Sequence, residues 1–250
     1  MTGRIRKERI RMAPAHGWHW RADEFAEMRR LSGDPLLSAV LPSFANYLGA
    51  KEAGRKDDAK EQLALALADF ERLDRVRQQD LVCFLIREIA LSRVFCPQPF
   101  LQLLLAFLRE WASEGEVQSD HLLGIGLITG DFEYFRRALS SNPADILAAK
   151  SLGRAVVKDL QYATHEMPSG YLGDPTADLA DARQTAKELH GSAGDSEIAD
   201  LRARLEALSL LVQSWLDYQG SQPKPGGPEF VAWAIENGRP YAMAPVAKPG

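Results

Sequence analysis

The sequence predicts an all-α protein, built from antiparallel helices and containing no sheet. Apolar residues recur at alternating spacings of three and four through most of the 250 residues, which is the period of a helix with one buried face. Pro, Gly and Asn interrupt this pattern at short intervals, as they do where helices end. No convincing segment alternates apolar and polar residues, so we expect no strands.

The clearest helical faces lie in the middle and the C-terminal half of the chain. We expect roughly ten helices joined by short loops, packed in a single domain over residues 21–218. An Asp followed by Pro at 34–35 is typical of an N-cap and first helical residue. The longest predicted face has apolar residues at all positions but the last: Ile198, Leu201, Leu205, Leu208, Val212, Trp215 and Gln219.

Composition narrows the class of protein. The chain is 46% hydrophobic and 26% charged, close to the average of globular proteins and unlike a disordered one. Its two cysteines exclude a disulfide framework. Both Cys83 and Cys96 lie in or beside apolar runs, where cysteine behaves as a small buried hydrophobe.

Charge is unevenly distributed along the chain. Residues 1–11 hold five Lys or Arg and one Glu, whereas the whole chain has a net charge of -4. We expect 1–20 to be a basic and aromatic N-terminal arm. An acidic body argues against nucleic-acid binding, which needs a basic face. His16 and His19 in this arm could offer two imidazoles to a metal, but packing of the neighbouring Trp residues explains them better.

Nothing in the sequence predicts a membrane segment. No apolar run reaches the roughly 18 residues that a spanning helix needs. The basic N-terminus is not followed by the apolar stretch of a secretory signal. We therefore expect a cytoplasmic protein.

Residues 119–143 carry small and turn-forming residues in a repeat-like order. Gly124 and Gly126 would let a second helix pack closely, a Gly-Asp-Phe turn follows at 130–132, and Ala138-Leu139 and Asn142-Pro143 close the unit. This segment resembles a tetratricopeptide repeat, although its second helix is about one turn too short.

Residues 41–72 show the same resemblance more weakly. Gly54 fits the turn glycine, and Ala59, Leu63 and Ala66 match the spacing of the second helix. The turn glycines of the two segments are 76 residues apart, which is not a multiple of the family's repeat length. The resemblance implies helical hairpins stacked as a short solenoid, with a concave face for a partner. Another α-helical array or bundle is the alternative.

Two motifs suggest ligand chemistry but fit helix structure better. The glycines at 124, 126 and 130 have the wrong spacing for a dinucleotide fingerprint, and no strand precedes them. The acids at 57, 58 and 61 have the DDxxE spacing of magnesium-binding motifs. They fit equally the first turn of a helix, where the dipole favours acids. We assign no catalytic residue, no metal ligand and no cofactor.

The turn-rich segment 165–175 is the first candidate binding region. It contains His165 and Glu166 at the end of a predicted long helix, then Tyr171 and Asp174. Long loops in compact helical proteins often bind partners. Two alternatives remain open: a purely structural loop, and an acid–base site in which His165, Glu166 and Asp174 converge.

The C-terminal region is the second candidate. Residues 219–228 have the composition of a linker, 229–238 can form a short helix capped by Gly238, and 239–250 form a tail. Phe230, Trp233 and Ala234 share one face of that helix, as in helices that bind in a groove. The helix can dock on its own chain, on another protein or on a second copy.

These observations favour a non-enzymatic protein that binds another protein, through a concave helical surface and the 165–175 loop. Our candidate binding residues are His165, Glu166, Tyr171, Asp174, Phe230 and Trp233. The acidic body favours a basic partner, and the C-terminal helix allows self-association. A small α-helical enzyme with an acid–base site in the loop, and an immunity protein for a basic toxin, are the alternatives.

Overall fold

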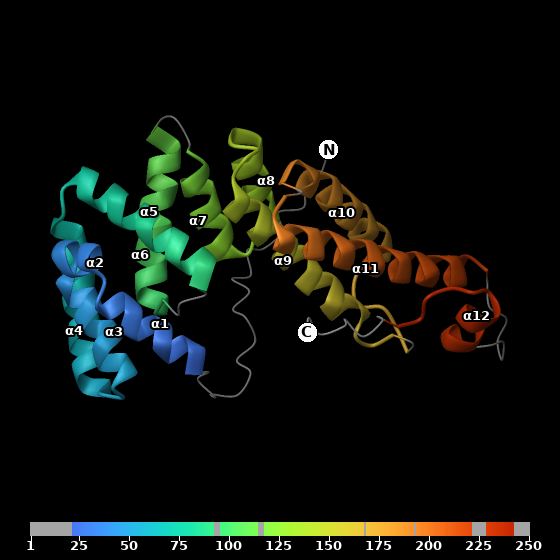
Figure 1. Cartoon of the computed structure of the whole chain (residues 1–250), viewed down its shortest axis with the longest axis horizontal. Coiled ribbons are helices and arrows are strands. Elements are labelled where there is room, and N and C mark those ends of the chain that lie inside the picture. Colours follow the sequence, from blue (N-terminus) through green and yellow to red (C-terminus); the bar gives the residue numbers. More distant parts are fainter. Residues whose placement is uncertain are drawn as a thin grey trace, which may run out of the picture. The chain divides into compact units, whose positions relative to one another are not determined.

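The protein is all-helical wherever the structure describes it. The computed structural model describes residues 22–92, 96–114, 118–167, 169–192, 194–221 and 229–242, and these hold twelve α-helices, one 3-10 helix and no strand (Figure 1). This confirms the predicted fold class. The expected N-terminal arm with His16 and His19, most of the expected linker and most of the tail lie outside the described residues.

The chain divides into two compact units, Met1–Ser141 (unit 1) and Asn142–Gly250 (unit 2). We had expected one domain over 21–218. The connection between the units is a short turn, in which Asn142 Oδ1 accepts a hydrogen bond from the Ala144 N–H. A boundary marked only by a short Asn-Pro turn does not stand out in the sequence.

Unit 1 contains eight described helices. Helix α3 packs on α1, α2 and α4, and α7 packs on α5, α6 and α8. The helices are α1 (Ala22–Ser32), α2 (Pro35–Val40), α3 (Pro42–Glu52), α4 (Lys56–Arg72), α5 (Arg75–Ser92), α6 (Gln98–Glu114), α7 (Ser119–Thr129) and α8 (Phe132–Ser141).

Aromatic residues from three helices join in the core of unit 1. Phe44 of α3 stacks on Phe100 of α6 with ring centroids 4.4 Å apart. Phe70 of α4 meets the edges of Phe100 and Phe107, at 6.1 Å and 5.7 Å. Such edge and offset contacts add to the hydrophobic effect of burying each ring.

Both segments with the repeat resemblance form helical hairpins, α3–α4 and α7–α8. Gly54 and Gly130 have φ of +71° after α3 and α7, a backbone conformation that glycine adopts without strain. A Cβ at Gly126 would lie 2.6 Å from the Phe135 ring of α8. Glycine therefore permits the close approach of α7 and α8, whereas the resemblance to a particular repeat family stays a prediction.

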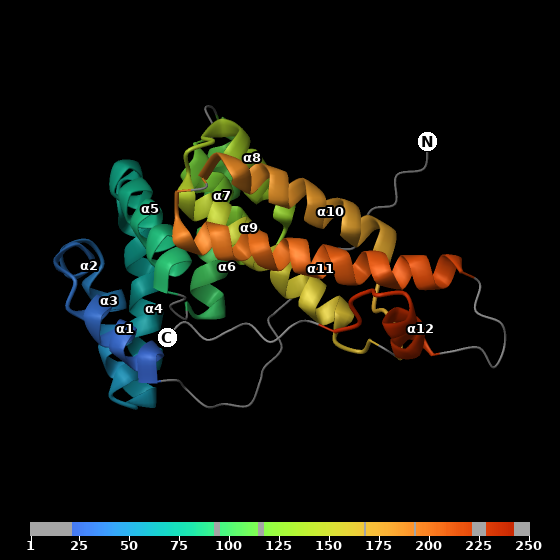
Figure 2. The ribbon, with the colours of Figure 1, turned by 45° about the vertical axis from the view of Figure 1, so that its right-hand side comes forward.

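Unit 2 contains α9 (Ile146–Thr164), α10 (Pro175–Glu188), the 3-10 helix η1 (Leu189–Ser192), α11 (Ser196–Gly220) and α12 (Phe230–Glu236). Helices α9, α10 and α11 pack against one another, and α12 packs on α11 (Figure 2). The apolar face predicted for 198–215 is confirmed, since all six of its apolar residues are buried.

The C-terminal boundaries differ slightly from those expected. Helix α11 continues to Gly220, so the first two residues of the predicted linker are helical. Helix α12 ends at Glu236 with Asn237 as its C-cap, and Gly238 has a φ of +61°, a conformation typical of a glycine just past a helix end.

Aspartate side chains fix the starts of six helices. Each accepts one or more hydrogen bonds from backbone N–H groups in the first turn that have no partner within the helix. The six residues are Asp34, Asp74, Asp131, Asp145, Asp174 and Asp195. The N-cap predicted at Asp34 is therefore confirmed.

Candidate functional site

The two segments singled out from the sequence meet at the C-terminal half of α11. Buried residues of α11 and α12 form an apolar group there, and partly buried residues of the 165–175 loop and of both helices pack around it. We call this group the aromatic cluster: Met167, Tyr171, Leu211, Trp215, Tyr218, Phe230, Trp233 and Ala234.

Phe230 is the central contact between α12 and α11. Its side chain is 1% exposed. Its ring meets the edges of Trp215 and Tyr218, with centroids 5.1 Å and 5.5 Å apart. Since Phe230 is covered within its own chain, it can reach a partner only if α12 moves.

The two other face residues of α12 lie beside Phe230. Ala234 is fully buried, and Trp233 lies with its ring centroid 5.6 Å from that of Tyr218. Ile235 points away from the cluster, with 60% of its surface exposed. The i, i+3, i+4 face predicted from the sequence is thus the face that docks on α11.

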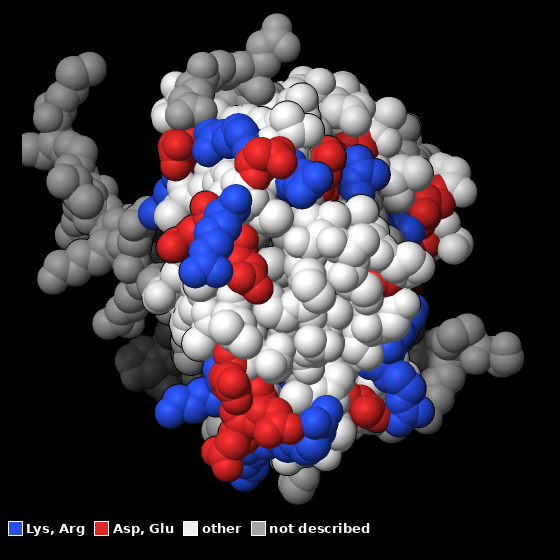
Figure 3. Space-filling model, turned by 90° about the vertical axis from the view of Figure 1, so that its left-hand side faces the viewer, with Lys and Arg blue, Asp and Glu red and all other residues white. Residues whose placement is uncertain are grey.

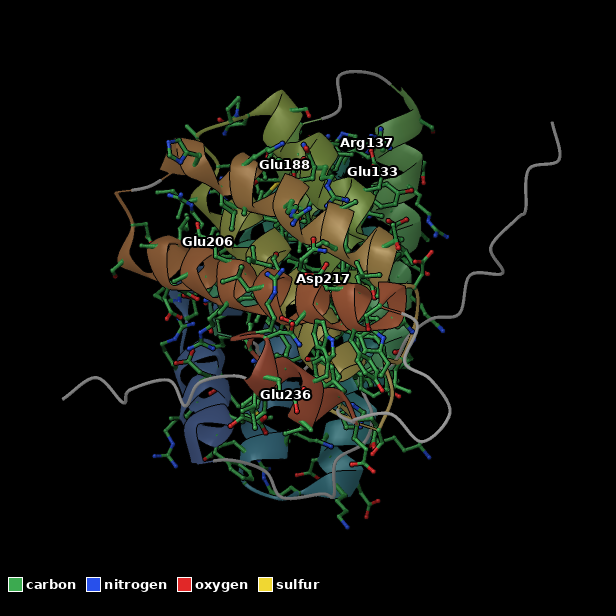
Figure 4. All side chains as sticks on the ribbon, turned by 90° about the vertical axis from the view of Figure 1, so that its right-hand side faces the viewer. Glu133, Arg137, Glu188, Glu206, Asp217 and Glu236 are labelled. Atoms are coloured by element: carbon green, nitrogen blue, oxygen red, sulfur yellow. The ribbon has the colours of Figure 1, made fainter. Side chains whose placement is uncertain are left out.

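An ion pair joins α11 to the chain just after α12. Arg239 Nη2 lies 2.8 Å from Asp217 Oδ2, and the Arg239 N–H donates to the Ala234 carbonyl at 2.7 Å. Asp217 also accepts a hydrogen bond from Gln213 on the same helix. Asp217 of α11 and Glu236 of α12 are labelled in Figure 4.

The indole N–H of Trp215 has no hydrogen-bond partner among the described residues. Trp215 is 8% exposed, and its Nε1 atom is buried. A buried donor without a partner costs about 1–3 kcal/mol. The docking of α12 therefore covers the indole without satisfying it.

The 165–175 loop is held by its own hydrogen bonds. The Leu172 N–H donates to the Ala163 carbonyl at 3.0 Å, and the Tyr171 hydroxyl donates to Asp178 Oδ2 at 2.8 Å. Burial, and then the bond to Asp178, raise the pKa of Tyr171. Tyr171 is thus a fixed neutral donor at the edge of the cluster.

Two of the three residues of the possible acid–base site pair with each other, and the third, Asp174, caps a helix. His165 and Glu166 pair with each other at 2.9 Å on an exposed surface, and His165 Nδ1 lies 2.5 Å from the Tyr162 carbonyl oxygen. Asp174 accepts from the Thr176 and Ala177 N–H groups at the start of α10. Each of the three is engaged in local structure at the end or the start of a helix.

Sequence reasoning missed the α11 side of the cluster. Leu211, Trp215 and Tyr218 were assigned only to helix packing or left out, and the Asp217–Arg239 pair was not expected. The available signal was the pair of large aromatics at i, i+3 near the end of the longest helix, shortly before a linker and a second aromatic face.

Unit 2 is acidic. Residues 142–250 contain ten Lys or Arg and fourteen Asp or Glu. Figure 4 labels four of these acids along α10, α11 and α12: Glu188, Glu206, Asp217 and Glu236. A partner that approaches α11 and α12 therefore meets negative charge near an apolar cluster.

Unit 1 presents an uncharged surface on the side shown in Figure 3. Lys, Arg, Asp and Glu surround a central area that carries none of them. Helices α2, α4 and α5 of unit 1 carry three exposed apolar residues: Leu36, Leu65 and Val76.

Comparisons with known proteins found no similar family model, curated protein or solved structure. No helix within the described residues is both long enough and apolar enough to cross a membrane.

Proposed function

We propose that this chain is a non-enzymatic protein–protein interaction protein, and that it binds its partner at the aromatic cluster of unit 2. One observation carries the proposal: the largest aromatic side chains of α11 are covered by a helix of only seven residues. Trp and Tyr are the residues that contribute most binding energy in protein interfaces.

The composition of the cluster supports a binding role over a purely structural one. Four of its eight members, Met167, Tyr171, Tyr218 and Trp233, are only partly buried. Tyr171 and Trp215 combine a large apolar surface with a polar group, which suits a contact that is partly wet. The concave surface expected from stacked hairpins remains a prediction.

The engagement of Asp174 as the N-cap of α10, apart from the His165–Glu166 pair, favours this proposal over the enzyme alternative. General acid–base catalysis needs the proton-transfer groups within hydrogen-bond reach of one reacting atom. Asp174 instead binds the first turn of α10. His165 and Glu166 can still form a polar border beside the cluster.

A basic partner in the cytoplasm fits the remaining features. Unit 2 carries four more acids than bases, and complementary charge accelerates association. Cys83 and Cys96 are free thiols, which suits a reducing compartment.

Photo-crosslinking of the full chain tests the proposal. Benzoylphenylalanine replaces Tyr218 of α11 in one variant and Leu210, an exposed residue of the same helix outside the cluster, in the other. We expect one protein from native lysate to crosslink to the first variant much more than to the second. The purified partner should then bind wild type and lose at least about tenfold affinity for Tyr218→Ala, because interface aromatics contribute 2 kcal/mol or more. Equal or absent crosslinking from two folded variants would refute the proposal.

A further inference from the structure

We infer that α12 occupies, within its own chain, the binding site of an amphipathic helix from the partner. This inference rests on the proposed function and adds the chemistry of the partner. The partner helix carries an aromatic residue, a second aromatic three positions later and a small residue at the fourth, followed by a basic residue. The template is Phe230, Trp233, Ala234 and Arg239.

Helix α12 is too short to be stable without its docking contacts. It has seven residues, and its N-cap residue Glu229 makes no side-chain capping bond. Isolated helices need about 12–15 residues to be even marginally stable in water. The helix therefore exists because Phe230 and Ala234 are buried on α11, and removing those contacts should release it.

The docking contacts are few enough to be replaced by a partner. Two side chains of α12, Phe230 and Ala234, are fully covered. The Asp217–Arg239 pair keeps 29% and 47% of its side chains exposed, and exposed pairs contribute little. A partner helix with a third apolar turn would bury more surface on α11 than α12 does.

The short segment before α12 favours docking of α12 on α11 even though the docking contacts are few. Seven residues, 222–228, separate Ser221 from Glu229, and five of them are Pro or Gly. A short tether gives a linked group an effective concentration in the millimolar range. An external helix must compete with that concentration. Its apparent affinity is therefore its intrinsic affinity multiplied by the fraction of molecules in which α12 is undocked.

Features of α11 set the chemistry of the competing helix. The Trp215 N–H is buried beside Phe230 and lacks a partner among the described residues. A helix that places an acceptor there gains a hydrogen bond that α12 does not make. Asp217, which now holds Arg239, selects a basic residue at the end of the incoming helix.

A labelled peptide tests this inference on the full chain. The probe is a fluorescein-labelled peptide of residues 229–242, measured by fluorescence anisotropy. Two full-chain variants form a matched pair: Ala234→Asp places a charge in the cluster, and Ile235→Asp places it on the exposed face. We expect Ala234→Asp to bind the peptide about tenfold or more tightly than wild type, because its own helix no longer competes. Ile235→Asp should behave as wild type.

Further measurements distinguish a failure of this inference from a failure of the proposed function. A probe with Phe230→Ala should not bind Ala234→Asp. If Ala234→Asp fails to fold by circular dichroism, full-chain Phe230→Ser replaces it. Equal peptide affinity for the opened variant and wild type would overturn the inference. So would a wild-type dimer, seen by sedimentation, that exchanges α12 between copies. Crosslinking at position 218 would still support the proposed function in either case.

Discussion

His121 of α7 is a buried imidazole in unit 1. It is 1% exposed and stacks on Trp111 with ring centroids 3.6 Å apart. Neither ring nitrogen has a hydrogen-bond partner among the described residues. Burial lowers the pKa of His121 below its ordinary value of 6.5, and the neighbouring Asp120 opposes this only in part. The folded chain therefore favours the neutral ring.

This imbalance predicts a loss of stability in acid. The unfolded chain takes up a proton on His121 near pH 6.5, whereas the folded chain resists it. Above pH 6.5 the ring is neutral in both states, so His121 does not lower the free energy of unfolding. As the pH falls from 6.5 through the lower folded pKa, the free energy of unfolding declines. Urea unfolding from pH 7.5 to 5 should show a smaller decline for His121→Leu than for wild type.

Gly126 predicts a second residue-scale effect. An added Cβ would lie 2.6–2.7 Å from two carbons of the buried Phe135 ring, so Gly126→Ala should force α7 and α8 apart. Overpacking of this kind costs typically 1–3 kcal/mol. Gly170→Ala is the control, because nothing lies within 4 Å of its Cβ position. Chemical denaturation should separate the two variants, and equal stability would contradict the packing argument.

Local rules predicted residues whose partners lie within one helical turn. Their neighbours in sequence predict Asp34 and Gly238 as helix caps, and the structure places both at helix ends. The pair Asp217–Arg239 spans 22 positions. No periodicity specifies which charged residues meet across two helices, so that contact was not predictable.

At the scale of elements, two substitutions test whether apolar burial or the ion pair holds α12 on α11. Phe230→Ala should undock the helix, because losing a buried Phe side chain costs about 3–5 kcal/mol. Asp217→Asn should leave it docked, because an exposed ion pair contributes about 0–1 kcal/mol. Limited proteolysis between 221 and 229 measures the difference. Rapid cleavage of Asp217→Asn, at the rate of Phe230→Ala, would show instead that the ion pair holds the helix.

The faces of long helices were predictable, and the destination of the short helix was not. Ile198 to Trp215 repeats its apolar spacing over about five turns, so helix and buried face follow from one pattern. Helix α12 shows the same pattern for two turns, which fits docking on any apolar surface. Its docking site contains Trp215 and Tyr218. That these residues form a docking site becomes apparent only when α9, α10 and α11 are packed together.

At the scale of the whole molecule, each unit has its own core. Phe100 is fully buried among the aromatics of unit 1, and Leu205 is fully buried in unit 2. Phe100→Ala should therefore reduce the hydrogen-exchange protection of amides in α3, α4 and α6. Amides of α9 and α11 should keep theirs, because local stability follows the contacts within a cooperative unit. Equal loss of protection in both units would show that the chain unfolds as one.

The order of the helices along the chain has a consequence for synthesis. Helix α12 follows α11, so a ribosome completes the aromatic surface of α11 before the helix that covers it has been made. A chain that stops in the segment 222–228 has made α11 without the helix that covers Leu211 and Trp215. Such a truncated copy would display this apolar surface to chaperones. The presence of α12 would thereby distinguish copies that carry the helix from copies that lack it.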